Sequence, residues 1–511
     1  MSQVPTLAAH NLLTSRLMQT QKNVYDLQTQ LSTKQKSQTY TGIASDSLRL
    51  INIENQASRT QAFITANTVA NTRLTAMNDS VSSARDSLKT FRDDLSQYLG
   101  RDLTTMSDEE INNFKDLQQR AFNTMKDVED YFDTKLDGQY LFAGGKADTV
   151  PVQIPYTSLD GFQQVYDGNT VTAPESRFAH MNNTQVTSAQ TGDLTFANGT
   201  STITAASADA FNLQHYTAAD TGAVTFTAAS GTIAATTPGA FSNVQSGMMI
   251  QVGGSGVAGD DRFYTVKSVS ADGRTLTLDP SIAADGVGAA GTEITVPSVQ
   301  PGPITITGSD NNARTYTVTG ISMDGTTLTV NPPPANEALT APHTVQISND
   351  IYYKGGETVV QHRVDETRTV EFGINAKDGA VEKAFRALGI VCQGMPTDGS
   401  GNVDGVELTR RLNQALGTIT DAIDHSAGNT TENGQDFGRL ENLLASNQIV
   451  LSNAMDRQKT QVSFYQTRAG EMENADITQV AVQINDEANA LQYSYAAMSM
   501  VNDLSLLNYL S

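Results

Sequence analysis

The sequence is poor in cysteine and in aromatic residues. Cys392 is the only cysteine among 511 residues, tryptophan is absent, and aromatic residues make up 6% of the chain. A single thiol excludes an intramolecular disulfide and a metal site built on paired cysteines. With hydrophobic residues at 38%, we expect an aliphatic core that is not large in any one place.

Two kinds of apolar segment are also missing. No stretch approaches 18 consecutive apolar residues, so we predict no membrane-spanning helix. Residues 1–10 contain no basic region followed by an apolar stretch, so we expect no cleavable signal peptide. The prediction is a soluble protein, or one exported by a route that does not read a classical signal.

Basic residues are scarce relative to acidic residues. Lys and Arg number 33, whereas Asp and Glu number 55, which gives a formal net charge of −22. Because phosphate recognition needs a basic surface, this balance excludes nucleic acid and an anionic membrane as the main partners. The length predicts three or four domains.

Both ends of the chain have apolar residues at alternating steps of three and four. This is the spacing of a heptad seam, the row of residues through which one helix packs on another. Ser107-Asp-Glu-Glu110 has the pattern of a capping box at a helix start. The segments with seam spacing are 13–31, 63–98 and 111–132 at the front, and 408–423, 437–451 and 477–498 at the back.

The middle of the chain has β alternation and two internal repeats. The segment 264–280 matches 316–332 at an offset of 52, and each copy has two alternating runs around Asp-Gly, the signature of a β-hairpin. A weaker repeat at an offset of 30 relates Gly192–Phe196 to Gly222–Phe226. A strand pair over 351–364 is predicted to lead back to the helices.

The fold class that follows is a mainly α coiled-coil bundle, formed by paired N- and C-terminal helices, with an inserted all-β region. We expect residues 1–150 to be the N-terminal helical half of the bundle. Residues 151–375 are the expected β-rich insertion, with duplicated hairpins and return strands, and 376–511 the C-terminal helical half.

The candidate chemical sites have simpler structural explanations. Gly254-Ser-Gly-Val-Ala-Gly259 fits a dinucleotide fingerprint, but Asp260, Asp261 and a strand follow it instead of a helix, so we predict a flexible hairpin loop. His362 lies near Asp365 and Glu366, and we interpret this segment as a solvated strand edge. Cys392 is predicted to be a packed small hydrophobe. We predict no catalytic, cofactor-binding or metal-binding residues.

Helical ends that pair around a variable β insertion resemble the flagellin superfamily of bacterial flagellar axial proteins. Within it, the hook–filament junction proteins (hook-associated protein 3) have segments similar to Gly138-Gln-Tyr-Leu-Phe-Ala-Gly-Gly145 and to a return strand at Tyr352-Tyr-Lys-Gly-Gly356. Flagellin usually carries Phe-Asn-Gly at the first of these places, which this chain lacks. The similar terminal segments are Leu31-Ser-Thr-Lys34, Ala475-Asp-Ile477, Leu491-Gln-Tyr-Ser-Tyr-Ala496 and Leu504-Ser-Leu-Leu507.

The resemblance implies a structural subunit, not an enzyme, that joins hook to filament. It implies export unfolded through the flagellar type III apparatus and an extracellular place on the flagellum. The implied partners are copies of the chain in a helical lattice, a hook-side junction protein, flagellin and an export chaperone. No nucleic acid, membrane or cofactor is implied.

The terminal helices are expected to be innermost in such a lattice, so their seams are the predicted assembly interface. The seam residues can also be intramolecular bundle positions, and some of them must be. Other functions stay open: flagellin itself, a secreted adhesin that works through the duplicated hairpins, or an enzyme. The predicted interface residues are Leu13, Leu17, Val24, Leu27, Leu31, Ile484, Leu491, Tyr495 and Met498.

Overall fold

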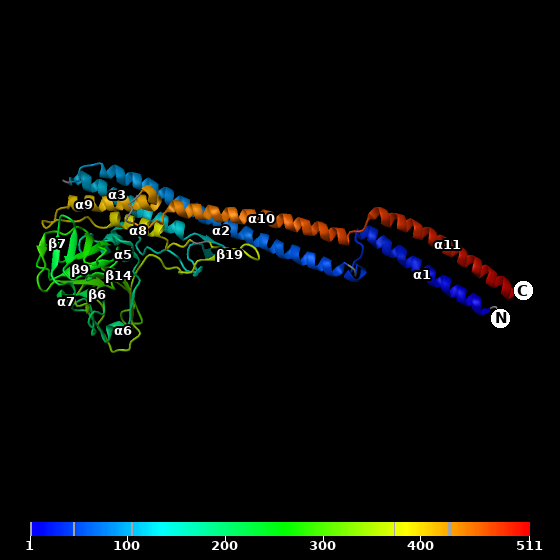
Figure 1. Ribbon diagram of the computed structural model, residues 1–511, viewed down its shortest axis with the longest axis horizontal. Helices are drawn as coiled ribbons and strands as arrows, with labels where there is room; N and C mark the ends of the chain where they lie inside the picture. The colour runs from blue at the N-terminus through cyan, green and yellow to red at the C-terminus, as the bar shows by residue number, and fades with distance from the viewer. Residues whose placement is uncertain (1–2, 44–45, 104–105, 372–373, 428–431, 511) are drawn as a thin grey trace. The chain divides into compact units, whose positions relative to one another are not determined.

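The computed structural model describes residues 3–43, 46–103, 106–371, 374–427 and 432–510, without the side chains of 3–7, 9 and 502–510 (Figure 1). The described chain forms two compact units. Unit 1 comprises Met1–Asn71, Arg363–Thr369 and Ile449–Ser511. Unit 2 comprises Thr72–His362 and Val370–Gln448. The predicted seam residues Leu504 and Leu507 lie outside the described side chains.

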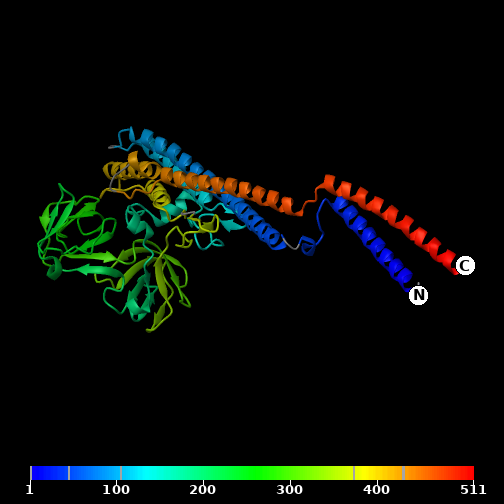
Figure 2. The ribbon, with the colours of Figure 1, turned by 45° about the vertical axis from the view of Figure 1, so that its right-hand side comes forward.

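Unit 1 is built from helices of both chain ends. It contains α1 (Gln3–Thr33), η1 (Tyr40–Ile43), the first part of α2 (Ser47–Leu99), the second part of α10 (Phe437–Glu473) and α11 (Ile477–Leu510). Helix α1 ends where Lys34 adopts a left-handed φ of 62°. Figures 1 and 2 show α1 and α11 side by side. The predicted pairing of the two chain ends is confirmed.

The helices of unit 2 include α3 (Asp108–Phe132), whose start confirms the capping box. The backbone N–H of Glu110 donates to the side chain of Ser107, and the Ser107 N–H donates to the Glu110 carboxylate at 2.9 Å. The seam of α2 from Ala70 to Tyr98 is buried, as its spacing predicts. The other helices are α4 (Leu159–Val165), α5 (Arg177–Met181), α6 (Ser188–Thr191), α7 (Ala218–Thr221), α8 (Gly379–Cys392), α9 (Gly405–Ile423) and η2 (His425–Ala427).

Helix α8 has no counterpart among the predicted helices. All of its residues are buried, including the charged Glu382, Lys383 and Arg386. Its apolar residues do follow seam spacing, at Val381, Phe385, Leu388 and Cys392, but only over 14 residues. Cys392 at its end is a buried free thiol, as predicted, and burial raises its pKa.

The β region consists of two eight-stranded antiparallel sheets. The outer sheet has the strand order β17-β4-β5-β16-β15-β14-β18-β3, and the nested sheet has the order β12-β7-β8-β11-β10-β9-β13-β6. The outer strands are β3 (Gln185–Val186), β4 (Leu194–Ala197), β5 (Thr202–Ala205), β14 (Gly302–Thr307), β15 (Thr315–Ile321), β16 (Thr327–Asn331), β17 (Glu337–Leu339) and β18 (Gln346–Asn349). The nested strands are β6 (Asn212–Tyr216), β7 (Val224–Thr227), β8 (Thr232–Ala235), β9 (Met249–Gly253), β10 (Phe263–Val269), β11 (Thr275–Asp279), β12 (Gly286–Val287) and β13 (Glu293–Pro297).

The two sheets are copies of one module. Their strand orders correspond one to one, and the nested sheet is inserted whole between β5 and β14 of the outer sheet. Tyr264 donates its hydroxyl to Asp260 at 2.9 Å, and Tyr316 makes the equivalent bond to Asn312 at 2.8 Å. The repeats at offsets of 52 and 30 are therefore parts of the same duplication, divided by the insertion.

The loop with the dinucleotide-like pattern connects β9 to β10, as predicted, but it is not simply flexible. The backbone N–H groups of Gly254 and Ser255 donate to the Asp261 carboxylate at 3.1 and 2.9 Å. The amides that a phosphate would need are thus already used inside the loop.

The strand pair predicted over 351–364 is wrong in extent. Residues 351–356 make only one isolated bridge, between Val152 and Tyr353. Regular pairing begins at β19 (Gln361–Arg363), which pairs with β20 (Thr369–Glu371). Another short hairpin joins β1 (Lys135–Leu136) to β2 (Gln139–Tyr140) through Asp137 and Gly138, both at positive φ.

Candidate assembly interface

The helices α1 and α11 lie antiparallel in unit 1. The Gln21 amide donates to the Tyr495 hydroxyl at 2.6 Å, and the Asn23 amide donates to Glu487 at 3.0 Å. The segment that follows α1 is also hydrogen-bonded to the end of α10, just before α11, because the Lys36 N–H donates to the Glu473 carbonyl at 2.7 Å. The two chain ends therefore share one continuous contact.

The predicted interface residues face this contact to different depths. Leu17 is buried, with 8% of its surface exposed, whereas Leu31 and Tyr495 are 39% and 49% exposed. The remaining predicted residues are half-buried: Leu13, Val24, Leu27, Ile484, Leu491 and Met498. Their role between subunits stays a prediction, because the structure contains one chain.

A second set of apolar residues on the same helices was missed by the seam analysis. On α1, Met18 and Tyr25 are 62% and 71% exposed; on α11, Tyr493 and Met500 are 76% and 66% exposed. Each pair is separated by seven residues, so each lies along one line of its helix. This heptad spacing outside the seam is the sequence signal that could have identified them.

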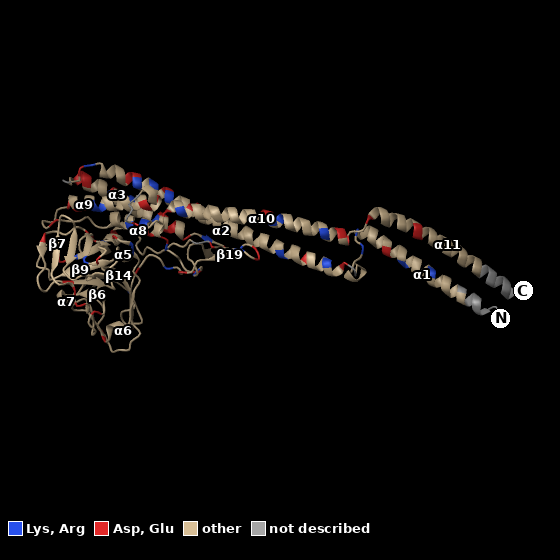
Figure 3. Cartoon of the chain, in the orientation of Figure 1, with Lys and Arg blue, Asp and Glu red and all other residues tan. Residues whose placement is uncertain are grey.

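The surface of the α1–α11 pair also has a charge pattern. A groove of about 640 Å³ is lined by Asp26 of α1 and by Asp486 and Glu487 of α11. Basic residues occur on α1, at Arg16 and Lys22, but α11 contains none (Figure 3). An approaching basic side chain would therefore find an acidic groove, and an acidic one would find the basic residues of α1.

Helices α2 and α10 are held together in unit 1 by a buried polar cluster. The Asn67 amide is completely buried and donates to the Val364 carbonyl and to the Gln458 side chain, both at 3.0 Å. Gln458 also donates to the Val364 carbonyl at 3.0 Å. A polar residue within an otherwise apolar seam fixes the register of the two helices, because any shift leaves its hydrogen bonds unmade.

The two segments that resemble junction proteins meet in unit 2. The Gly356 N–H donates to the Ala143 carbonyl at 2.8 Å, and the Tyr353 hydroxyl donates to the Gly356 carbonyl at 2.7 Å. Gly144 has φ +58°, and a side chain there would collide with the Gly356 carbonyl. Gly144 and Gly356 are thus required by one close backbone contact.

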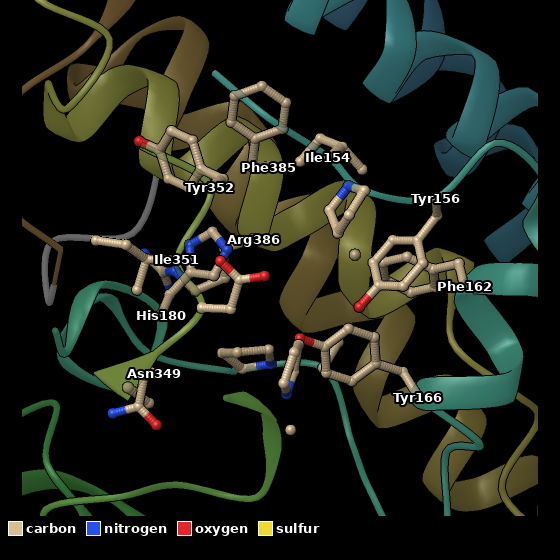
Figure 4. Close-up of a pocket in the computed structure, with 18 of the residues that line it drawn as sticks. Ile154, Tyr156, Phe162, Tyr166, His180, Asn349, Ile351, Tyr352, Phe385 and Arg386 are labelled. Atoms are coloured by element: carbon tan, nitrogen blue, oxygen red, sulfur yellow. The ribbon is translucent and has the colours of Figure 1, made fainter. Parts of the chain in front are cut away.

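Aromatic residues extend this contact to the helices of unit 2. Phe142 packs against Phe132 of α3 at a ring distance of 4.7 Å, and Tyr352 packs against Phe385 of α8 at 4.7 Å (Figure 4). We call residues 138–145 and 352–356 together the junction cluster. Its position fixes where the chain leaves the helices for the β region and where it returns.

Buried charges connect α8 to its neighbours in unit 2. Arg386 donates to Glu382 at 2.9 Å and, through both terminal nitrogens, to Glu432 at 2.8 and 2.9 Å. Burial raises the pKa of Glu382, but Arg386 and His180 outweigh this effect and hold it at about 2. Lys383 forms a fully buried ion pair with Asp421. These groups form a satisfied network with no unpaired charge among the residues named.

The Asp133 side chain, at the C-terminal end of α3, has an environment that disfavours its charged form. Burial, together with nearby Glu129 and Asp130, raises its pKa to about 7, although it accepts a hydrogen bond from the Val152 N–H at 3.0 Å. The position also faces the negative end of the helix dipole. Its folded-state pKa lies above its unfolded-state value, so stability falls as pH rises from about 4 to about 7.

Replacing Asp133 with asparagine is therefore expected to raise the melting temperature at pH 8 by a few degrees, on the order of the shift for about 1 kcal/mol. Asparagine keeps an oxygen that accepts the Val152 N–H but has no charge to desolvate. The gain should vanish at pH 4, where the aspartate is protonated in the fold. Calorimetry at both pH values, with Asp130→Asn as the control, checks this; an equal gain at pH 4 would contradict it.

The histidines do not form a metal centre. In the described residues, no group of three or more His, Cys, Asp or Glu side chains is placed to hold a metal ion. His180 and His425 contact Glu382 and Asp421 at 3.0 and 2.8 Å. His362 lies on β19, an edge strand as predicted; its neighbours Gln361 and Arg363 are exposed, while His362 itself is half-buried, and burial lowers its pKa. No helix in the described part of the chain has the length and apolar character needed to cross a bilayer.

Comparison with solved structures identifies similar flagellar proteins. FlgL from Xanthomonas campestris is 13% identical, with 81% of this chain and 97% of that chain covered and a TM-score of 0.30. The similarity is to flagellar junction proteins. From Legionella pneumophila, flagellar hook associated protein-3 is 15% identical (88% and 98% covered, TM-score 0.26), and the flagellar junction protein FlgL is 13% identical (83% and 99% covered, TM-score 0.27).

No family model and no curated protein sequence matches the chain.

The weak burial between α1 and α11 predicts that an isolated subunit is easily cut at both ends. Among their described side chains, only Leu17 and Val480 are buried, and regions with few buried contacts open most readily. Limited proteolysis of a verified monomer should remove α1 and α11 first and leave a resistant fragment that contains the β region. Full protection of both ends in the monomer would contradict assembly-coupled ordering of these helices.

Proposed function

We propose that the chain is a structural subunit of the bacterial flagellum that joins hook to filament. The observation that carries this proposal is the junction cluster. Two segments, each similar in sequence to a characteristic segment of junction proteins, lie more than 200 residues apart and contact each other through required glycines. A chance likeness of two separate segments gives no reason for such a contact.

The paired ends supply the means of self-assembly. The pair α1–α11 leaves Leu31 and Tyr495 exposed, and Met18, Tyr25, Tyr493 and Met500 lie on its outer surface. Exposed apolar side chains repeated at heptad spacing are typical of a helix surface that another helix covers. The expected partners are other copies of the chain, a hook-side junction protein and flagellin, with an export chaperone before assembly.

The same proposal gives the chain a place outside the cell, and it requires no catalytic residues, in line with the sequence analysis, which predicts none. The chain would leave the cell unfolded through the flagellar export apparatus without a cleavable signal peptide, and act outside the cell. Its single cysteine is compatible with this route, because no disulfide has to form afterwards.

Immunogold labelling of isolated flagella tests the proposal. A narrow band at the distal end of the hook is expected, and deletion of the gene should leave hooks without filaments while flagellin is released into the medium. Labelling along the whole filament would instead identify the chain as flagellin. Labelling of the cell surface away from flagella would favour the adhesin.

A further inference from the structure

Helix α11 has a second row of residues at heptad spacing, outside the seam that joins it to α1. The row advances in steps of four, three, four, three and four, which is the spacing of a helix that packs against another. We call it the α11 row, and all of its members are exposed: Val482, Asp486, Asn489, Tyr493, Ala496 and Met500.

Helix α1 has an equivalent row, which we call the α1 row. Its members follow steps of three, four, three and four: Ser15, Met18, Lys22, Tyr25 and Thr29. Met18 and Tyr25 in this row are exposed, as are Val482 and Tyr493 in the α11 row. Because side chains that faced each other within the pair would be covered, both rows point away from the seam. The pair therefore offers an uncovered helix face on each of its two helices.

Each row contains one charged residue, and the two charges are opposite. Lys22 is the charged residue of the α1 row, and Asp486 is that of the α11 row. Both are exposed, and among the described residues neither forms an ion pair within its own subunit. The whole helices differ in the same sense, because α1 contains two basic residues and one acidic residue, whereas α11 contains three acidic residues and no basic one (Figure 3).

These charges decide which rows can pair between copies of the chain. A contact between two α1 rows would bring two lysines into one interface without a counter-charge from either row. A contact between two α11 rows would do the same with two aspartates. An α1 row against an α11 row pairs the opposite charges and places apolar side chains on both sides of them, so this combination is the complementary one.

The hydrogen bonds within the pair set the register of such a contact. Gln21 bonds to Tyr495 and Asn23 to Glu487, so Lys22 lies level with about residue 491 of its own antiparallel α11. Asp486 is about five residues from that level, or roughly 7.5 Å along the helix. A neighbouring copy displaced by this distance brings its Lys22 level with Asp486 and its Tyr25 level with Val482.

We propose that the α11 row of one copy packs on the α1 row of the next copy, with Lys22 paired to Asp486. The contact rests on the proposed function, since it supplies the lateral bond between subunits of the flagellar structure. It joins two different surfaces, so each added copy leaves one α1 row and one α11 row uncovered. The contact therefore continues from copy to copy instead of closing a dimer.

Charge reversal in the full-length chain tests the pairing, in a strain that lacks the native gene. Lys22→Glu and Asp486→Lys should each lower incorporation into flagella at least about tenfold, because each brings like charges together. The double variant should recover incorporation. Co-production of the two single variants should also recover it, because each supplies the charge that the other lacks. Immunoblots of isolated flagella measure incorporation.

Two controls separate loss of the contact from loss of folding. Arg16→Glu makes the same change of charge at an exposed residue of α1 outside the α1 row, and it should be incorporated as the wild type is. Circular dichroism of the purified single variants should show unchanged helix content, because Lys22 and Asp486 are exposed.

Disulfide cross-linking in isolated flagella tests the register. The native thiol, Cys392, is buried and does not interfere. The variant Tyr25→Cys, Val482→Cys should form a ladder of covalent multimers on oxidation, because each copy bonds to one neighbour through each cysteine. A mixture of the two single cysteine variants should stop at dimers, and either single variant alone should stay monomeric.

The opposite results would overturn the contact. These are incorporation of both charge-reversed single variants at the wild-type level, a folded double variant that stays out of the flagella, and no multimers beyond dimers from the double cysteine variant. Dimers from Tyr25→Cys alone would show instead that two α1 rows meet. The labelling experiment uses only the wild type, so a narrow band at the hook together with unaffected variants refutes this contact and leaves the proposed function standing.

Discussion

Replacing Leu17 with aspartate is expected to abolish assembly while leaving unit 2 folded. Leu17 is the most deeply buried of the predicted interface residues. A carboxylate without a partner in an apolar seam costs several kcal/mol, comparable to the whole contact between two helices that bury so little. Flagellar incorporation in vivo and sedimentation of the purified subunit measure the loss, and circular dichroism monitors the fold.

The control for this change is Gln19→Asp, which adds the same charge two residues away on the exposed side of α1. It should assemble as the wild type does. Equal assembly of both variants would show that the α1–α11 seam is not needed for the polymer.

Exposed residues on the same helices separate contacts within a subunit from contacts between subunits. Tyr495 is half exposed and has a hydrogen bond with Gln21, whereas 76% of the surface of Tyr493 is exposed to solvent. If Tyr493→Ser stops assembly without changing the helix content of the monomer, the outer face of α11 contacts another subunit. If only Leu491→Asp and Leu17→Asp stop it, the seam acts by pairing α1 with α11.

Replacing Lys383 with methionine is expected to destabilise unit 2 by about 3–5 kcal/mol, since it leaves the Asp421 carboxylate buried without its cation. Both side chains of this ion pair are completely buried, and Lys383 also donates to the Gln435 carbonyl at 2.9 Å. Urea unfolding followed by circular dichroism at pH 7 measures the change in unfolding free energy.

The double variant Lys383→Met, Asp421→Asn is the matched test of this cause. Removing the second charge should recover much of the lost stability, because the cost arises from the unpaired ion and not from the missing lysine. A double variant less stable than Lys383→Met would show that packing around Asp421, including its contact with His425 at 2.8 Å, matters more than charge.

The terminal helices could be predicted because their physics is local. A stripe of apolar residues at steps of three and four fixes which face is covered, and the seam from Ala70 to Tyr98 is buried as expected. The same spacing could not predict how deeply each residue is buried: Leu17 and Leu31 belong to the same seam, yet Leu17 is buried and Leu31 is exposed. The extent of burial depends on the partner helix, and the spacing within one helix carries no information about it.

Other features were beyond prediction because they are long-range. Helix α8 has apolar residues at steps of four, three and four from Val381 to Cys392, but its buried Lys383 and Arg386 argue against burial when taken alone. The two segments of the junction cluster were each recognisable, but nothing in either indicates their contact. From its local sequence, Gly356 would be assigned to a turn. In the structure a glycine is needed at this position because the backbone of Ala143 and Gly144 packs closely against it.

The nested sheet shows where this chain accepts foreign sequence. Its two ends are adjacent, since the Ser298 N–H donates to the Phe211 carbonyl at 2.9 Å and Pro297 pairs with Asn212. The outer sheet closes around this pair of ends, and side chains of the nested sheet also bond to it, as Gln251 does to the Ile321 carbonyl at 3.1 Å. The chain therefore has a natural insertion site for another domain. A foreign domain whose two termini lie equally close together could replace residues 212–297, and each assembled copy of the chain would then display it.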